Sequence, residues 1–131
     1  MINQLPEFAS AIRVREGWYV NSRSYRNNNP GNLRYSKYQT GIRDGYAYFL
    51  TYQQGWDALI FDLRAKCTGN TKAKDASGKL LNPDSTILNF CEAYAPSSDG
   101  NRPLKYAEFI ASRLNLSISS SLKEIYSERQ P

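Results

Sequence analysis

Glu16 is the residue of this chain whose type and position most suggest chemistry. Three large apolar residues at helical spacing precede it on what should be one buried helix face: Leu5, Phe8 and Ile12. Glu16 takes the next position on that face, and Gly17 predicts the end of the helix. Desolvation and the negative end of the helix dipole both disfavour the charged form of a carboxyl group there. The pattern is typical of a general acid, although a partly exposed helix-end glutamate paired with Arg13, Arg15 or another arginine fits the same spacing.

An asparagine-rich string follows at residues 26–34, which read Arg-Asn-Asn-Asn-Pro-Gly-Asn-Leu-Arg. Pro30 fixes its own φ angle and Gly31 has a permissive backbone, so the string predicts a tight turn. Its asparagines offer paired donors and acceptors within one loop. On these residues alone, turn stabilisation explains the string somewhat better than ligand contact does.

Aromatic residues are concentrated in the non-helical segment that contains this string. Those between residues 18 and 56 are Trp18, Tyr19, Tyr25, Tyr35, Tyr38, Tyr46, Tyr48, Phe49, Tyr52 and Trp56. Aromatic faces beside amides and arginines suit either stacked single-stranded bases or sugar rings. The alternative is a ribbon whose tyrosines only cover the core.

Positive charge is concentrated in nearly the same segment. The net charge is +5, and residues 13–43 carry a marked basic excess with Glu16 as their one acidic residue. Such a segment favours an anionic polymer, either nucleic acid or a bacterial wall with its peptide carboxylates and phosphate polymers.

The composition bounds the chemistry further. A chain of 131 residues is enough for one compact domain. The lack of histidine excludes mechanisms that use a histidine base, and we expect no metal and no cofactor. Cys67 and Cys91 lie on apolar helix faces, which predicts two buried free thiols, with a disulfide as the alternative if the helices touch. We expect neither a membrane span nor a signal peptide.

The expected elements make a mainly α fold with about five helices and a small β ribbon between the first two. The expected helices cover residues 4–17, 53–68, Asp84 or Ser85 to Tyr94, 102–114 and 119–127. The last helix has a capping box at Ser121 and Glu124. The expected strands are Leu33–Tyr38 and Arg43–Leu50.

Taken together and in order, these motifs resemble a family of phage and bacterial peptidoglycan-cleaving domains. The family belongs to the lysozyme-like superfamily, which includes soluble lytic transglycosylases, and the matches span about residues 8–114. The matching motifs are Glu16-Gly17-aromatic, the string at 26–34, Asp44-Gly45-Tyr46-Ala47-Tyr48-Phe49, Gln54-Gly55-Trp56-Asp57-Ala58-Leu59, Tyr94-Ala95-Pro96 and Tyr106. The resemblance implies one lysozyme-like catalytic domain over 1–131, an α+β variant of the mainly α class. It also implies that Glu16 is the catalytic acid.

The implied reaction cleaves the β-1,4 bond between N-acetylmuramic acid and N-acetylglucosamine. Lytic transglycosylases need one glutamate, because the 6-hydroxyl of the sugar attacks; a muramidase would need a second carboxylate. Asp44 is the candidate for that second carboxylate, although it precedes Gly45 and suits a turn-capping role better. We therefore favour the single-glutamate reaction. The expected substrate-binding residues are Asn29, Asn32, Arg34, Tyr35, Tyr46 and Tyr94.

Several alternatives stay open at this point. Asn29 and Asn32 fit either loop support or contact with acetamido groups, Arg34 fits contact with a lactyl or peptide carboxylate, and Tyr94 fits either the groove or the core. The expected partners are peptidoglycan glycan strands and, from the resemblance, other phage virion proteins. The resemblance also suggests a virion protein, or a host-cytoplasmic protein released to the wall. The rival functions are a non-enzymatic wall-binding or phage structural domain and, less favoured, a single-stranded nucleic-acid binder.

Overall fold

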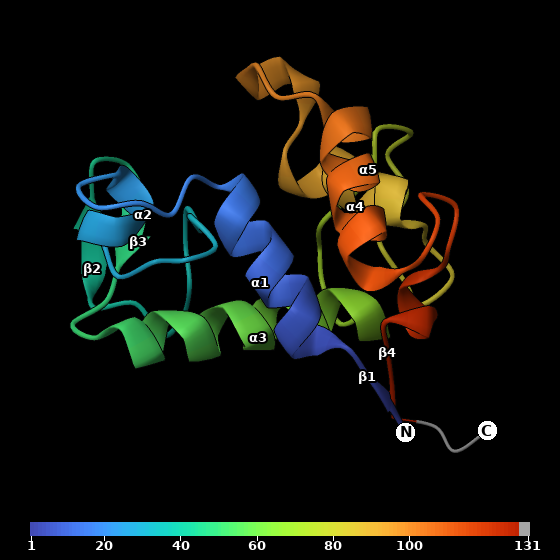
Figure 1. Cartoon of the computed structure of the whole chain (residues 1–131), viewed down its shortest axis with the longest axis horizontal. Helices are drawn as coiled ribbons and strands as arrows, with labels where there is room; N and C mark the ends of the chain where they lie inside the picture. The colour runs from blue at the N-terminus through green and yellow to red at the C-terminus, as the bar shows by residue number, and fades with distance from the viewer. Residues whose placement is uncertain (129–131) are drawn as a thin grey trace. The chain divides into compact units, whose positions relative to one another are not determined.

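The computed structural model describes residues 1–128, which form five α-helices and four short strands (Figure 1). The helices are α1 Leu5–Arg15, α2 Arg23–Arg26, α3 Tyr52–Thr68, α4 Ile87–Tyr94 and α5 Pro103–Leu114. The strands are β1 Ile2–Asn3, β2 Gly41–Arg43, β3 Tyr46–Tyr48 and β4 Tyr126–Ser127. Two short 3-10 helices complete the set, η1 Ser97–Asp99 and η2 Leu122–Glu124. The predicted mainly α class with a small ribbon is confirmed.

The chain divides into two compact units, each described here by itself. One unit is formed by Met1–Phe8 together with the chain from Arg64 onward, and the other by Ala9–Leu63. The prediction of a single lysozyme-like domain over 1–131 stays a prediction, and its last three residues lie outside the described residues.

The first unit is built around the α4–α5 pair. The two helices pack against each other, and the ring of Phe8 meets that of Phe90 edge-on at 4.9 Å. Cys67 and Cys91 are buried and are not joined in a disulfide, as predicted. The strands β1 and β4 form a two-stranded antiparallel ribbon, in which Ile2 is paired with Ser127.

Two predictions in this unit need correction. Helix α4 begins after Thr86, whose side chain forms a reciprocal capping box with Asn89, and not after Asp84 or Ser85. The predicted helix at 119–127 is a single 3-10 turn, because β4 follows it and pairs with β1. The capping box of Ser121 and Glu124 is present and begins that turn.

The second unit holds the β2–β3 ribbon and α2. Asp44 and Gly45 form the turn between the strands with φ angles of 56° and 79°, the left-handed values that a two-residue hairpin turn requires. The strand predicted over Arg43–Leu50 is therefore shorter than expected: β3 covers Tyr46–Tyr48, and Arg43 is the last residue of β2, before the turn. The strand predicted over Leu33–Tyr38 is not formed, and the four-residue helix α2 was not predicted at all.

Helix α3 contacts the asparagine-rich loop through a glycine. A Cβ atom added to Gly55 would overlap the carbonyl oxygen of Asn28, and it would lie 2.9 Å from the carbonyl carbon and 3.1 Å from Cδ of Pro30. The absence of a side chain at Gly55 therefore lets the loop lie directly on the helix backbone.

Candidate active site

Glu16 lies at the C-terminal end of α1, as the capping residue that follows its last turn. The N–H of Gly17 donates to the carbonyl oxygen of Val14 at 3.1 Å. The N–H of Trp18 donates to the carbonyl oxygen of Arg13 at 3.3 Å, and Gly17 has a φ of 79°. These two bonds and the left-handed glycine make a Schellman motif. The half-buried Glu16 is thereby fixed where the helix stops.

The asparagine-rich loop brings Asn32 to this carboxyl group. Nδ2 of Asn32 donates to Oε1 of Glu16 at 3.4 Å. Asn32 has a left-handed φ of 50°, and its N–H donates to the carbonyl oxygen of Asn29 at 2.9 Å. Its Oδ1 is buried and has no hydrogen-bond partner within residues 1–128. Of the predicted site residues, Asn32 is thus placed in direct contact with Glu16.

Asn29 supports the loop from inside. Its side chain is fully buried, Nδ2 donates to the carbonyl oxygens of Leu33 and Ala47, both at 2.9 Å, and Oδ1 accepts from the N–H of Leu33 at 3.0 Å. These bonds favour the loop-support role of Asn29. Its role as a substrate-binding residue stays a prediction.

The neighbouring asparagines tie the same loop to the ribbon. Nδ2 of Asn27 donates to the carbonyl oxygen of Arg43 at 3.2 Å, and Nδ2 of Asn28 donates to that of Phe49 at 3.0 Å. The backbone adds a bond from the N–H of Phe49 to the carbonyl oxygen of Asn27 at 2.9 Å. Three consecutive asparagines thus hold the loop in place, and the fourth asparagine of the string contacts Glu16.

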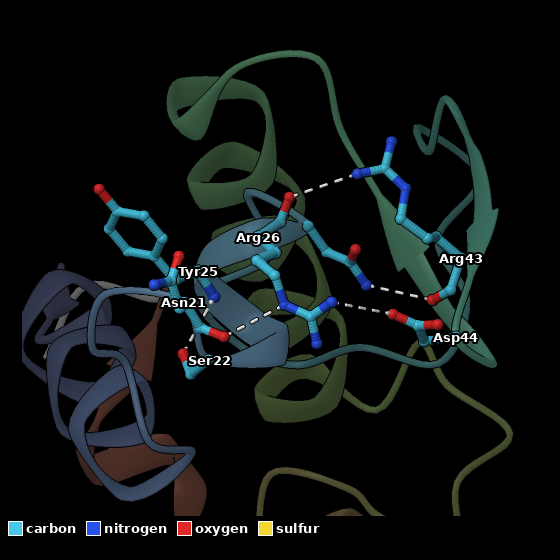
Figure 2. A network of polar contacts seen from close by, with 7 residues as sticks. Asn21, Ser22, Tyr25, Arg26, Arg43 and Asp44 are labelled. Atoms are coloured by element: carbon cyan, nitrogen blue, oxygen red, sulfur yellow. Dashed lines mark hydrogen bonds and ion pairs between the residues drawn. The ribbon is translucent and has the colours of Figure 1, made fainter.

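Asp44 lies in the exposed turn of the hairpin, where its Oδ2 is 3.5 Å from Nη1 of Arg26 (Figure 2). Both side chains are about half exposed, at 52%. The same guanidinium donates through Nε to the carbonyl oxygen of Asn21 at 3.1 Å. This placement favours the turn and ion-pair role of Asp44, and its role as a second catalytic carboxylate stays a prediction.

Arg34 and Tyr46 are brought together on the outside of the ribbon. The guanidinium carbon of Arg34 lies 4.7 Å from the ring centroid of Tyr46, and that of Arg23 lies 3.7 Å from the same centroid. Tyr35 is 70% exposed. It lines a shallow pocket of about 220 Å³ in this unit. The pocket is lined by Leu33, Tyr35, Ser36, Lys37, Ala58, Phe61 and Asp62.

Tyr94 belongs to the other unit, as the last residue of α4. Its ring stacks on Phe90 at 5.1 Å and meets Tyr106 edge-on at 6.4 Å. It is half-buried, and Nζ of Lys66 lies 5.8 Å from its ring centroid. The role of Tyr94 in substrate binding stays a prediction.

Sequence reasoning missed a cluster beside the end of α1. Nη1 of Arg13 donates to the hydroxyl of Tyr52 at 2.7 Å. The ring of Tyr52 lies 5.2 Å from that of Trp18, which in turn lies 5.2 Å from that of Tyr25. The sequence suggests Arg13 as an ion-pair partner of Glu16 and as part of the basic segment at residues 13–43. The aromatic count drew attention to this segment, but contacts between positions so far apart have no signal in the spacing.

No group of three or more histidine, cysteine, aspartate or glutamate side chains within residues 1–128 is placed to hold a metal ion. Among the same residues, no helix has the length and apolar character needed to cross a bilayer.

Comparison with known proteins returned no match to a protein-family model, to a curated protein or to a solved structure.

Proposed function

We propose that this protein cleaves peptidoglycan glycan strands, with Glu16 as a single general acid and base. The observation that carries the proposal is the placement of Glu16 at the end of α1, half-buried and contacted by Asn32 at 3.4 Å. A carboxyl group held this way is available for proton transfer while its orientation is restricted. The resemblance described above supplies the substrate class.

In the proposed reaction, the carboxylic acid of Glu16 protonates the glycosidic oxygen between N-acetylmuramic acid and N-acetylglucosamine as the bond from C1 to that oxygen breaks. The resulting carboxylate then takes the proton of the muramic acid 6-hydroxyl, whose oxygen attacks C1. The products are a 1,6-anhydro end and a free 4-hydroxyl, and Glu16 is again protonated.

Asn32 suits a partner that changes its protonation state. Its Nδ2 can donate to the carboxylate, and rotation of the amide by half a turn would present Oδ1, a buried oxygen with no other partner in residues 1–128, to accept from the acid. One side chain could thus serve both states of Glu16 without moving the backbone.

The position of Asp44 supports the transglycosylase form of the proposal over the muramidase form. A muramidase of this type would need a second carboxylate near the sugar ring. Asp44, the candidate for that role, lies in an exposed hairpin turn and pairs with Arg26 at 3.5 Å. Delivery to the wall by a phage particle, or release at lysis, belongs to the proposal and rests on the resemblance alone.

The test is digestion of purified sacculi by the wild type, Glu16→Gln and Glu7→Gln, with mass spectrometry of the released muropeptides. Glu7 is an exposed glutamate in the first turn of the same helix and is the matched control. We expect anhydro-muropeptides from the wild type and from Glu7→Gln, and none from Glu16→Gln.

Two results would contradict parts of the proposal. Reducing-end products that disappear in Glu16→Gln would keep the acid and make the protein a muramidase, with Asp44→Asn as the next variant. No release by the wild type, on sacculi that a control lysozyme digests, would leave a wall-binding or structural domain.

A further inference from the structure

The outer face of the β2–β3 ribbon carries arginines stacked on tyrosines. In the register of the ribbon, Arg43 is paired with Tyr46 and Gly41 with Tyr48. Paired residues project to the same side of a ribbon, and alternate residues along one strand share a face. Ala47, between the two tyrosines, points the other way and is fully buried. The tyrosines therefore share the outer face with Arg43.

Three guanidinium groups lie over these two rings. Those of Arg23 and Arg34 are over Tyr46 at 3.7 and 4.7 Å, and that of Arg43 is over Tyr48 at 4.1 Å. We call Arg23, Arg34 and Arg43 the arginine face, and all three are exposed. The guanidinium groups of Arg23 and Arg34, both over the ring of Tyr46, are at most about one Debye length apart. Both therefore attract the same bound anion.

Gly41 makes room for this arrangement. A Cβ atom at Gly41 would lie 2.8 Å from a ring carbon of Tyr48, a separation that real side chains do not reach. The ring of Tyr48 therefore lies across the neighbouring strand, where it supports Arg43.

The negative charge beside the arginine face is already neutralised. Asp44, in the turn of the ribbon, pairs with Arg26 at 3.5 Å, and Nη1 of Arg43 donates to the carbonyl oxygen of Arg26 at 3.4 Å (Figure 2). The ion pair of Arg26 and Asp44 contributes no net charge, so Asp44 does not offset the charge of the arginine face.

The geometry favours phosphate over bases as the feature recognised. A guanidinium stacked on a ring keeps its in-plane N–H groups free of the ring, and these groups match the oxygens of a phosphate. Proteins that bind single-stranded nucleic acid also use open aromatic faces on which bases stack. The rings of Tyr46 and Tyr48 have guanidinium groups over them instead, so a base would have to displace an arginine.

We propose that the arginine face binds a linear polyol-phosphate polymer, a repeating phosphodiester that carries no bases, of the kind found in bacterial walls. The choice of the wall as its source rests on the proposed function. The binding itself does not involve Glu16 or turnover, so it can be tested separately.

The experiment measures the affinity of the full chain for a defined poly(glycerol phosphate) by fluorescence anisotropy across a series of salt concentrations. For three neutralised phosphates on a flexible chain, the logarithm of the association constant should fall against log salt with a slope of about −2. In Arg23→Gln/Arg43→Gln we expect at least about tenfold weaker binding at low salt and a slope nearer −0.7, because one contact remains. The matched control is Lys72→Gln/Lys74→Gln, which removes the same charge from two exposed lysines of the other unit.

A second variant separates stacking geometry from charge. Arg23→Lys/Arg43→Lys keeps both positive charges but loses the planar guanidinium groups. We expect its affinity for the polymer to lie between the affinities of the wild type and of Arg23→Gln/Arg43→Gln. Thermal unfolding by circular dichroism shows whether each variant is folded.

Three results would overturn the proposal. The first is an equal loss of affinity in Arg23→Gln/Arg43→Gln and in Lys72→Gln/Lys74→Gln, which would indicate that only the net charge matters. The second is tighter binding of an oligothymidylate with the same number of phosphates, which would indicate nucleic acid. The third is no binding of the polymer at low salt. Loss of sacculus digestion in Glu16→Gln with unchanged polymer binding would separate this proposal from the proposed function.

Discussion

Gly55→Ala tests whether the asparagine-rich loop lies directly on α3. In an open helix interior this change should stabilise the protein by about 1 kcal/mol, because alanine is the better helix former. Here the added methyl group would overlap the carbonyl oxygen of Asn28 and come within 2.9 Å of its carbonyl carbon. The two effects have opposite signs, so the sign of the measured change identifies the larger one.

The magnitude follows from what must move. The obstructing atoms are mostly backbone, which cannot rotate away as a flexible side chain would, and overpacking of this kind costs about 1–3 kcal/mol. A shift of the loop would also strain the bonds from Nδ2 of Asn28 to Phe49 and from Nδ2 of Asn29 to Leu33 and Ala47. Each such bond contributes about 1 kcal/mol net. If all three bonds are lost, and after subtraction of the gain in helix propensity, we expect a loss of about 3–5 kcal/mol.

The measurement is urea unfolding of the full chain, followed by circular dichroism. Gln53→Ala, at an exposed neighbouring position of α3, is the control and should change the free energy of unfolding by less than about 0.5 kcal/mol. A Gly55→Ala protein as stable as the wild type, or more stable, would refute the close approach of loop and helix. The loop that carries Asn32 would then lack the support described here.

Two further predictions concern titratable groups. Hydrogen bonds from Arg64 and Tyr126 and the charge of Arg64 lower the pKa of Glu128. Its contribution to stability should therefore be complete above its unfolded pKa and disappear as pH falls through the lower folded pKa. The stability gap between wild type and Glu128→Gln should narrow as pH falls below the unfolded pKa, and a gap that stays constant would contradict this. Burial raises the pKa of the Cys67 thiol to about 12, and Cys91 is buried as well. We expect no reaction of the native protein with a thiol reagent at pH 8 and reaction of both thiols in denaturant without reductant, whereas fast labelling of the native protein would argue against this burial.

The sequence predicted the long helices well because each has apolar periodicity over several turns. The expected ranges 53–68 and 102–114 differ by one residue at most from α3 and α5. Side-chain hydrogen bonding explains why the expected strand at Leu33–Tyr38 failed. The N–H and carbonyl groups of Leu33 bond to the side chain of Asn29, so a side chain takes the place of a strand partner, and no period in the sequence reports that.

The predicted N-terminal cap of α4 was wrong for a related reason. Ser85 is a good capping residue by type, but it is buried and its Oγ accepts from the N–H of Asn82 at 3.0 Å. Asp84 is taken up by an ion pair with Lys123 at 2.7 Å. These contacts left Thr86 as the cap. Lys123 lies too far along the chain from Asp84 for local spacing to reveal, whereas the bond between Asn82 and Ser85 spans only three residues.

The candidate site divides in the same way. Glu16 and its glycine could be placed from the sequence, because a helix end is a local feature. The sequence could not show that Asn29 is a buried support of the loop while Asn32 contacts Glu16, because both are asparagines in the same turn. Arg23 was missed because its position over Tyr46 depends on α2, a helix too short to show any periodicity.

The ribbon of β1 and β4 has a consequence for how this chain could be joined to others. Because Ile2 is paired with Ser127, a short linker could join these two positions, and the chain could be reopened at the exposed turn of Ala76–Gly78 to give a circular permutant with the same pairing. For the same reason, the protein could be inserted into a surface loop of a host protein, where it would enter and leave at a single point and leave the flanking strands of the host undisturbed.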